Sequence, residues 1–172
     1  MKPISSEAMV SGTPQADATT LYQALKERVG RVRGDRRLAV PPAFTATAHS
    51  PTCGSTVTLD AEIEDGRIRE LGHRVRACSL GQAATAMLLD RAAGLTGERA
   101  ATIREQLAAL LRSGEGRCDW PEFEVFAHAQ HMPARHGSAL LPFDALEQLF
   151  NQARQGTRPA TPEQGVDITL TH

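Results

Sequence analysis

One short segment, Glu-Asp-Gly-Arg at residues 64–67, constrains the fold of this chain most, because it separates two runs that alternate in polarity. An Asp-Gly pair between alternating runs is a strong local signal for a tight β-hairpin turn. The two runs are residues 56–63 and 68–77, and residues 44–50 form a β-branched run before them. We therefore expect an antiparallel meander of three strands.

The second expected strand indicates how the sheet is covered. Val57, Leu59, Ala61 and Ile63 share one face, and polar residues share the other. Because successive side chains of a strand point to opposite faces, one face of the sheet is apolar and must be covered by helices. The predicted fold is α+β, a three-stranded antiparallel sheet packed on one face by helices.

Helical periodicity appears on both sides of these strands. Apolar stripes predict helices over 18–29, over 78–94 with Gly94 closing it, and after Thr96, which caps the next helix. Asp119 is expected as the N-cap of a short helix over 119–130. A last helix is expected over 133–150, with Pro142 either kinking it or marking its true start.

Composition limits the organisation and excludes some function classes. A chain of 172 residues with 41% hydrophobic content suits one globular domain, which we place at 17–150 between disordered segments at 1–16 and 151–172. A net charge of −1 gives no electrostatic footprint for nucleic acid or an anionic membrane. No apolar run suggests a signal peptide or a membrane span, so we expect a cytoplasmic protein with reduced thiols.

The three cysteines, Cys53, Cys78 and Cys118, are too few for a disulfide framework. Cys53 lies in the turn between the first two strands, where Gly54 permits close backbone approach. Cys78 lies where the third strand gives way to a helix, and free N–H groups at a helix start stabilise a thiolate. We expect both sulfurs to lie close together near the surface at one end of the sheet. Read in isolation, Cys78 is equally a small buried hydrophobic residue, and Cys118 an incidental thiol.

Three blocks of sequence, in this order and spacing, resemble the U-type iron-sulfur cluster assembly scaffolds, the IscU, SufU and NifU N-terminal family. The likeness covers roughly residues 18–150 and implies the SufE/NifU-like fold. The blocks are SPTCGSTVTLDAEIEDGRI from residue 50, ACSLGQAATAMLLDRAAG from residue 77 and MPARHGSALLPFDALEQL from residue 132.

The resemblance implies a metal or cluster site whose ligand set is incomplete here. Cys53 and Cys78 match the first two family cysteines, while Ser55 stands at the family's aspartate and Ser138 at its third cysteine. An iron-sulfur cluster or a zinc ion would therefore be labile, or absent. His136, Cys118 or a second chain could complete the site. His136 points to the same side as Ser138 only in an extended segment, since in a helix the two diverge by about 200°.

The function implied by the resemblance is a non-catalytic scaffold for iron-sulfur cluster assembly, binding a cluster or metal transiently or accepting sulfur from a cysteine desulfurase. The chaperone-recruiting Leu-Pro-Pro-Val-Lys motif of the family is absent at residues 130–137, so no dedicated Hsp70-type partner is expected. One alternative is an interaction protein that keeps the fold without the metal. Another is a thiol enzyme with Cys78 as nucleophile and His136 as base. His49 and His73 are expected on the strand surface, and His128 and His131, although spaced by three residues, are expected as exposed residues of a helix rather than as a metal-binding pair.

Overall fold

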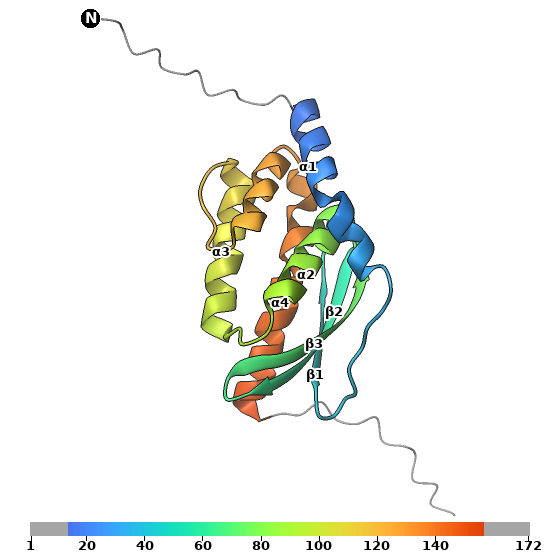
Figure 1. Ribbon diagram of the computed structural model, residues 1–172, viewed down its shortest axis with the longest axis vertical. Helices are drawn as coiled ribbons and strands as arrows, with labels where there is room; N and C mark the ends of the chain where they lie inside the picture. Colours follow the sequence, from blue (N-terminus) through green and yellow to red (C-terminus); the bar gives the residue numbers. More distant parts are fainter. Residues whose placement is uncertain (1–13, 157–172) are drawn as a thin grey trace, which may run out of the picture.

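The computed structural model describes residues 14–156, which form one sheet and the helices around it (Figure 1). In chain order the elements are α1 (Pro14–Val29), the 3₁₀ helix η1 (Gly30–Val32), β1 (Phe44–His49), β2 (Thr56–Glu64), β3 (Arg67–Arg76), α2 (Ser79–Arg91), α3 (Gly97–Ser113), the 3₁₀ helix η2 (Pro121–Ala129) and α4 (Pro133–Gln155).

The sheet has the predicted topology, with the antiparallel order β1-β2-β3. In its register Leu59 lies opposite Ala46 on one side and His73 on the other. The hairpin turn places both Asp65 (φ 53°) and Gly66 (φ 73°) in the left-handed region. Positive φ at both central residues is the requirement of the type I′ turn, whose twist matches that of the flanking strands. The Asp-Gly signal thus predicted the turn correctly.

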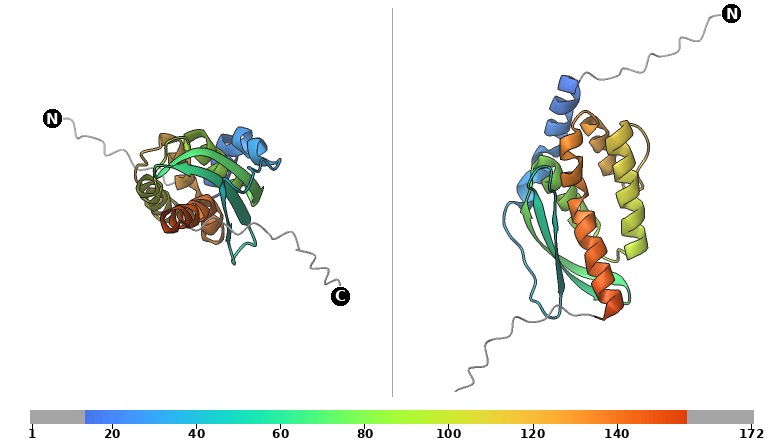
Figure 2. Two further views of the ribbon diagram at one scale, coloured as in Figure 1. Left: turned by 90° about the horizontal axis from the view of Figure 1, so that it is seen from below. Right: turned by 180° about the vertical axis from the view of Figure 1, so that it is seen from behind.

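The helices lie on one side of the sheet, with α4 running beside the strands (Figure 2). Helix α4 contacts β1, β2, α2 and α3, so it is the element around which the core is assembled. Val57, Leu59 and Ala61 of β2 are fully buried beneath it, as the alternating pattern predicted. The prediction of an α+β domain with helices on one face of the sheet is confirmed.

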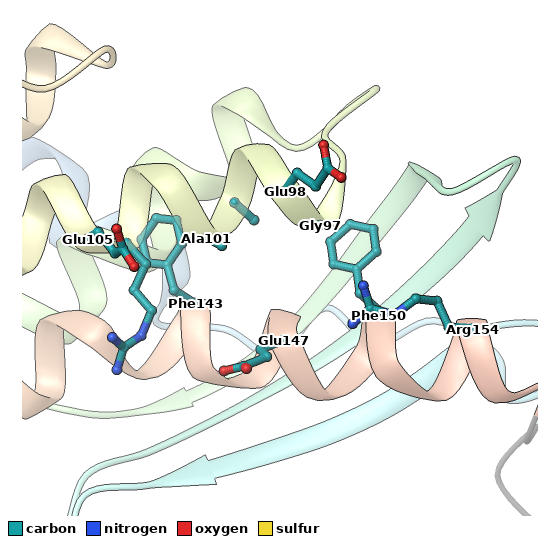
Figure 3. Close-up of a pocket in the computed structure, with 10 residues that line it drawn as sticks. Gly97, Glu98, Ala101, Glu105, Phe143, Glu147, Phe150 and Arg154 are labelled. Carbon is teal, nitrogen blue, oxygen red and sulfur yellow. The ribbon is translucent and has the colours of Figure 1, made fainter.

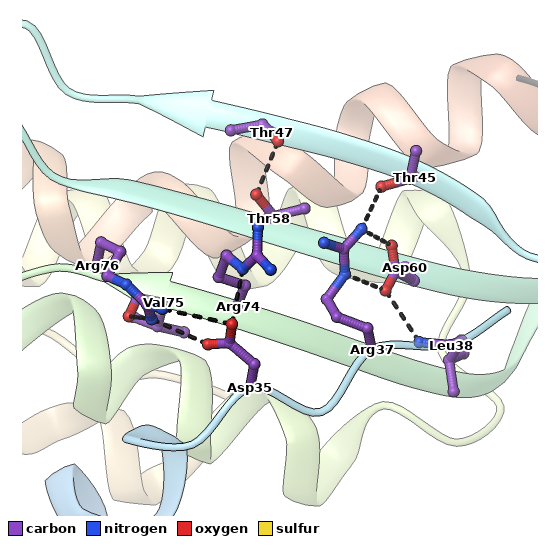
Figure 4. A network of polar contacts seen from close by, with 10 residues as sticks. All are labelled: Asp35, Arg37, Leu38, Thr45, Thr47, Thr58, Asp60, Arg74, Val75 and Arg76. Atoms are coloured by element: carbon purple, nitrogen blue, oxygen red, sulfur yellow. Dashed lines mark hydrogen bonds and ion pairs between the residues drawn. The ribbon is translucent and has the colours of Figure 1, made fainter. Parts of the chain in front are cut away.

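The segment between η1 and β1 crosses the other face of the sheet, where Asp60 is completely buried (Figure 4). Arg37 binds both carboxylate oxygens of Asp60, at 2.6 and 2.8 Å, and the amide of Leu38 donates to the same group at 3.0 Å. Burial acts to raise the pKa of Asp60, but the bonds from Arg37, Thr45 and Leu38 outweigh it and leave that pKa below its ordinary value. A Cβ on Gly72 would lie 2.7 Å from a backbone oxygen of this segment, so glycine lets the segment pass.

Two helix ends differ from the sequence prediction. Residues 119–130 form a 3₁₀ helix that begins at Pro121, and Asp119 does not cap it. Asp119 is instead held by Arg99 at 2.6 Å, because an ion pair with the neighbouring helix competes with the cap. Thr96 caps α3 as predicted, accepting a hydrogen bond from the amide of Arg99.

The sequence analysis assigned too many residues to the disordered segments at the two ends of the chain. Helix α1 begins at Pro14 and α4 continues to Gln155, so residues 14–16 and 151–155 are helical. A proline fits the first turn of a helix, where the amide has no intrahelical partner, and Gly156 (φ 66°) provides the left-handed stop after α4. Residues 1–13 and 157–172 lie outside the described residues.

The expectations for Pro142 and His73 also differ in part from the structure. Pro142 lies inside α4, which begins at Pro133, so it does not mark the start of the helix. His73 is buried, whereas His49 is exposed as expected. Exposed Arg74 and Arg76 follow His73 on β3, so the sequence around His73 is charged. The charged neighbours suggested a surface position, although His73 lies on the helix-covered face of the sheet.

A groove of about 340 Å³ lies between α3 and α4 (Figure 3). Its floor includes Phe143 and Phe150, and its rim carries charged residues such as Glu98 and Arg154. A Cβ on Gly97 would lie 3.2 Å from the ring of Phe150, which shows how closely the helices pack there. No cysteine lines this groove.

Within residues 14–156, no helix combines the length and apolar character that crossing a bilayer requires.

We predict that Arg37→Ala lowers the free energy of unfolding by about 2 kcal/mol at neutral pH, because it leaves the buried carboxylate of Asp60 unpaired. Urea denaturation measures this, with Arg33→Ala, at an exposed position that makes no ion pair within the described residues, as the control. Since the folded pKa of Asp60 is lowered, the pair stabilises the fold above the unfolded pKa of about 4 and loses its effect as the pH falls below it. Equal unfolding energies for the two variants would contradict the role given to this pair.

Candidate functional site

Cys53 lies in the tight turn that connects β1 to β2, and its side chain is exposed. Two backbone bonds close this turn: the amide of Gly54 donates to the carbonyl of Ser50, and the amide of Ser50 donates to the carbonyl of Ser55, both at 2.9 Å. Gly54 has φ 68°, a conformation that favours glycine. The turn therefore holds the thiol at the end of the sheet in a fixed position.

Cys78 is the residue that immediately precedes α2, with an extended backbone conformation (φ −68°, ψ 173°). Its carbonyl accepts the first hydrogen bond of the helix, from the amide of Gln82 at 3.0 Å. Its side chain is half-buried and donates to the hydroxyl of Ser138 at 3.3 Å. Both cysteines thus occupy the kinds of position that the sequence predicted, a turn and a helix start.

A continuous chain of hydrogen-bonding groups connects the two thiols. Cys53 Sγ lies 3.1 Å from Ser55 Oγ, Ser138 donates to Ser55 Oγ at 3.2 Å, and Cys78 donates to Ser138 at 3.3 Å. Ser50 extends the chain, with its Oγ 3.3 Å from Cys53 Sγ. We call these five residues the thiol–hydroxyl chain. The two sulfurs are therefore separated by only three hydrogen-bond lengths.

The two central hydroxyls are buried, although both thiols reach toward the surface. Ser138 has no exposed surface and Ser55 is 4% exposed. Ser138 packs against α2, where a Cβ on Gly81 would lie 2.5 Å from its Oγ and 2.9 Å from its carbonyl oxygen. Gly81 therefore permits α2 and α4 to approach closely enough for Ser138 to contact Cys78.

The surroundings of Cys53 and Cys118 shift the pKa values of these two thiols in opposite directions. The pKa of Cys53 is lowered below that of a free thiol, chiefly by hydrogen bonding to Ser50 and then to Ser55, against a smaller opposing effect of burial. The pKa of Cys118 is raised, chiefly by burial. Because the thiolate is the nucleophile and the metal ligand, Cys53 is the better activated of these two.

His136 and Cys118 do not join the thiol–hydroxyl chain. The segment around His136 is helical, and its Nε2 is bonded to the carbonyl of Ala129 at 2.7 Å. His136 could point to the same side as Ser138 only in an extended segment, and this segment is helical. Cys118 is buried in the hydrophobic core beside Trp120.

A shallow pocket of about 400 Å³ surrounds the thiols, and its walls include two arginines that the sequence reading did not select. Arg76 comes from the end of β3 and is paired with Asp35 at 2.9 Å, while Arg135 comes from the first turn of α4. Both stand within three residues of a matched ligand position, Arg76 before Cys78 and Arg135 before Ser138. That proximity was the signal available in the sequence. The charge of Arg76 is balanced by Asp35, whereas Arg135 makes no ion pair within the described residues and leaves a positive charge at the pocket.

The donor set fits a two-thiolate site better than a closed metal centre. Zinc and iron in such sites take about four ligands, and soft thiolates bind them far better than alcohols. The thiol–hydroxyl chain supplies two thiols, and the hydroxyls of Ser55 and Ser138 already bind each other. Among residues 14–156, no group of three or more Cys, His, Asp and Glu side chains is arranged to hold a metal ion.

Comparisons with solved structures agree with the fold and with the resemblance. The NifU-like N-terminal protein of Brucella abortus is 31% identical, with a TM-score of 0.71 over 81% of this chain and 98% of that chain. A SUF-system scaffold protein of Fervidobacterium islandicum AW-1, titled as putative, shares the fold at 18% identity, with a TM-score of 0.64 over 77% of this chain and 98% of that chain.

Comparisons of sequence lead to the same group of proteins. The iron-sulfur cluster assembly scaffold protein IscU of Streptococcus pyogenes serotype M1 is 21% identical over 107 residues, which are 61% of this chain and 67% of that protein. The sequence model of the NifU-like N-terminal domain matches residues 16–119, more than half of the chain. The resemblance seen in the sequence is confirmed, and the chain belongs to the NifU-like N-terminal domain family.

Proposed function

We propose that this protein acts in iron-sulfur cluster assembly as a scaffold-like protein that accepts sulfur on Cys53 and holds sulfur or metal transiently between Cys53 and Cys78. The observation that supports this most is the thiol–hydroxyl chain, which joins both cysteines to both serines at the matched ligand positions. The protein is not itself an enzyme in this proposal. It works in the cytoplasm, where thiols remain reduced.

Sulfur acceptance needs a nucleophilic thiolate and a persulfide donor, which in this proposal is a cysteine desulfurase. The thiolate of Cys53 attacks the outer sulfur of the donor persulfide, a new S–S bond forms on Cys53, and the donor cysteine leaves as a thiolate. The exchange is balanced without an added oxidant or reductant. The exposure of Cys53 and its lowered pKa both favour this step.

Cys78 supplies the second sulfur ligand for the cargo. A metal ion or nascent cluster held between Cys53 and Cys78 would lack the two anionic donors that an aspartate at Ser55 and a cysteine at Ser138 would provide. We therefore propose weak, reversible binding, suited to passing the cargo to another protein. A second chain could supply further ligands at the open pocket.

A second candidate function is an interaction protein that retains the fold without cargo. The hydrogen bond between Ser138 and Ser55 favours it, because it satisfies the hydroxyls without any metal. A thiol enzyme with Cys78 and His136 as a catalytic pair finds no support, since His136 is bonded to the carbonyl of Ala129. The two remaining candidates differ in whether Cys53 receives sulfur.

One prediction from this proposal concerns the reactivity of Cys53. Its alkylation by iodoacetamide should reach half of the maximal rate at a pH below the value of about 8.5 for a free thiol, because Ser50 and Ser55 stabilise the thiolate. Ser50→Ala should move this midpoint upward, and Ser113→Ala, on an exposed serine remote from the thiols, should not. Mass spectrometry of the Cys53 peptide measures the rate. A wild-type midpoint at or above that of a free thiol would contradict the activation.

Another prediction tests sulfur acceptance directly. With a cysteine desulfurase of the source organism and free cysteine, the peptide containing Cys53 should gain one sulfur atom, detected by mass spectrometry without reduction. Cys53→Ser should abolish this gain, and Cys118→Ala, which removes a buried thiol, should leave it unchanged. Absence of sulfur on the wild-type peptide, with the desulfurase active on a known scaffold, would favour the interaction protein instead.

A further prediction concerns metal affinity. Wild-type protein should release zinc to a mild chelator, while Ser138→Cys combined with Ser55→Asp should bind zinc at least about a hundredfold more tightly, because two strong donors are added. Competition titration under anaerobic conditions measures both affinities. Equal and tight binding by wild-type protein would show that other ligands complete the site.

A further inference from the structure

Cys53 and Cys78 stand at the same end of the sheet and line the same pocket. The register places Thr56 of β2 opposite Arg76 of β3. Cys53 comes three residues before Thr56 and Cys78 two residues after Arg76, so the chain reaches both cysteines from the same end of the hairpin. The side chain of Cys53 is exposed, so it can rotate toward Cys78 without entering the core. The two thiols are therefore placed to react with each other.

Cys78 is the thiol that a sulfur atom carried on Cys53 can meet within this chain. The sequence contains three cysteines, and Cys118 is buried in the hydrophobic core. Ser138, which stands at the third cysteine position of the family, carries a hydroxyl and cannot form an S–S bond. A persulfide on Cys53 thus has Cys78 as its internal reaction partner.

The hydrogen bonds of the thiol–hydroxyl chain run in one direction, from Cys78 to Cys53. Cys78 donates to Ser138, and Ser138 donates to Ser55. The hydrogen of the Ser55 hydroxyl is then free to point at the sulfur of Cys53, 3.1 Å away, when that sulfur carries a negative charge. Each serine accepts one hydrogen bond and donates another, so a proton that leaves Cys78 has a path to the sulfur on Cys53.

The oxidation state of the cargo sets the chemistry that such a pair of thiols can perform. The outer sulfur of a persulfide is at the oxidation level of elemental sulfur, whereas the inorganic sulfur of a cluster is sulfide. Converting one into the other needs two electrons. Two thiols supply two electrons when they join in a disulfide, and thiol exchange at a persulfide needs no other reactant.

We propose that Cys78 resolves the persulfide formed on Cys53, so that the protein releases hydrosulfide and retains a disulfide between Cys53 and Cys78. This inference rests on the sulfur acceptance proposed above. The sulfur of Cys78 attacks the Sγ atom of Cys53, where an S–S bond between the two cysteines forms and the bond to the outer sulfur breaks. The outer sulfur leaves with the electron pair of the broken bond.

The step is balanced in atoms, charge and electrons. A persulfide anion on Cys53 and the thiol of Cys78 give a disulfide and HS⁻. The proton of Cys78 passes through Ser138 and Ser55 to the departing sulfur. The outer sulfur is reduced, and the two cysteine sulfurs together lose the two electrons that it gains.

The disulfide also changes what the site can bind. It removes both sulfur ligands, so the pair cannot hold a metal ion until a dithiol reductant restores the two thiols. Release of sulfide and binding of metal therefore alternate at one site. The serines at the matched ligand positions are compatible with this alternation, because they bind each other without a metal.

The experiment follows the sulfur on the full-length protein over time, under anaerobic conditions, with a cysteine desulfurase and one equivalent of free cysteine. In wild-type protein the sulfur on the Cys53 peptide should appear first and then decline, while hydrosulfide and linked Cys53 and Cys78 peptides accumulate. Mass spectrometry without reduction detects the peptides, and a colorimetric assay detects the hydrosulfide.

The variant Cys78→Ser keeps a hydroxyl next to Ser138 and removes the resolving thiol. Its persulfide on Cys53 should last at least about tenfold longer, because an internal thiol acts at a high effective concentration. Cys118→Ala should behave like wild-type protein. The inference is overturned if wild-type protein keeps the persulfide while Cys78 stays a free thiol, or if Cys78→Ser loses its sulfur as fast as wild-type protein.

Failure of the proposed function gives a different result from failure of this inference. If neither wild-type protein nor Cys78→Ser gains sulfur from the desulfurase, sulfur acceptance from that donor is wrong. A low-molecular-weight persulfide then loads Cys53 without the desulfurase. Linked Cys53 and Cys78 peptides in wild-type protein would support the resolving role of Cys78, and their absence would overturn it.

Discussion

The close approach of α2 and α4 at Gly81 and Ser138 is the contact on which the site depends. Helix α4 carries Ser138 in the core, and Cys78 immediately precedes α2, three residues before Gly81. Any side chain larger than that of glycine at residue 81 would collide with the backbone and hydroxyl of Ser138. The packing of two helices therefore sets the position of Cys78, and the turn after β1 brings Cys53 to the same place.

The chemistry of this end of the domain follows from having hydroxyls where a metal site would have anionic donors. A buried serine needs a hydrogen-bond partner, and Ser138 finds two, in Ser55 and Cys78. The same bonds that stabilise the packing therefore organise the thiols. Cys53 remains exposed and activated, while the two serines are internal, so the exposed thiol is the group best placed to meet another protein.

Most of the fold could be predicted because its signals are local. The Asp65-Gly66 turn, the alternation in β2 and the Thr96 cap each depend on a few neighbouring residues, and the structure confirms them. The burial of Asp60 and His73 could not be predicted, because it depends on a loop and a helix far away in the sequence. Asp119 failed as a cap for the same reason, since Arg99 on α3 competes for its carboxylate.

The site was predicted in part. The resemblance selected Cys53, Cys78, Ser55 and Ser138, and the structure brings them together. Ser50, Gly81 and the pocket arginines were missed, since their roles arise from contacts between segments that are distant in the sequence. The sequence did not determine whether the residues before Ser138 are extended or helical, so His136 remained a candidate ligand. In the structure α4 begins at Pro133, and the segment is helical.

The central claim is that Ser55 and Ser138 form one connected chain between the thiols, and a double-mutant cycle on the free energy of unfolding tests it most directly. Ser55→Ala, Ser138→Ala and the double variant would be compared by urea denaturation. Because the two hydroxyls bind each other, we predict a coupling energy of about 1 kcal/mol. Ser138→Ala combined with Thr47→Ala, whose hydroxyl binds Thr58 on the outer face of the sheet, should be additive. Additive effects of Ser55→Ala and Ser138→Ala would contradict the connected chain.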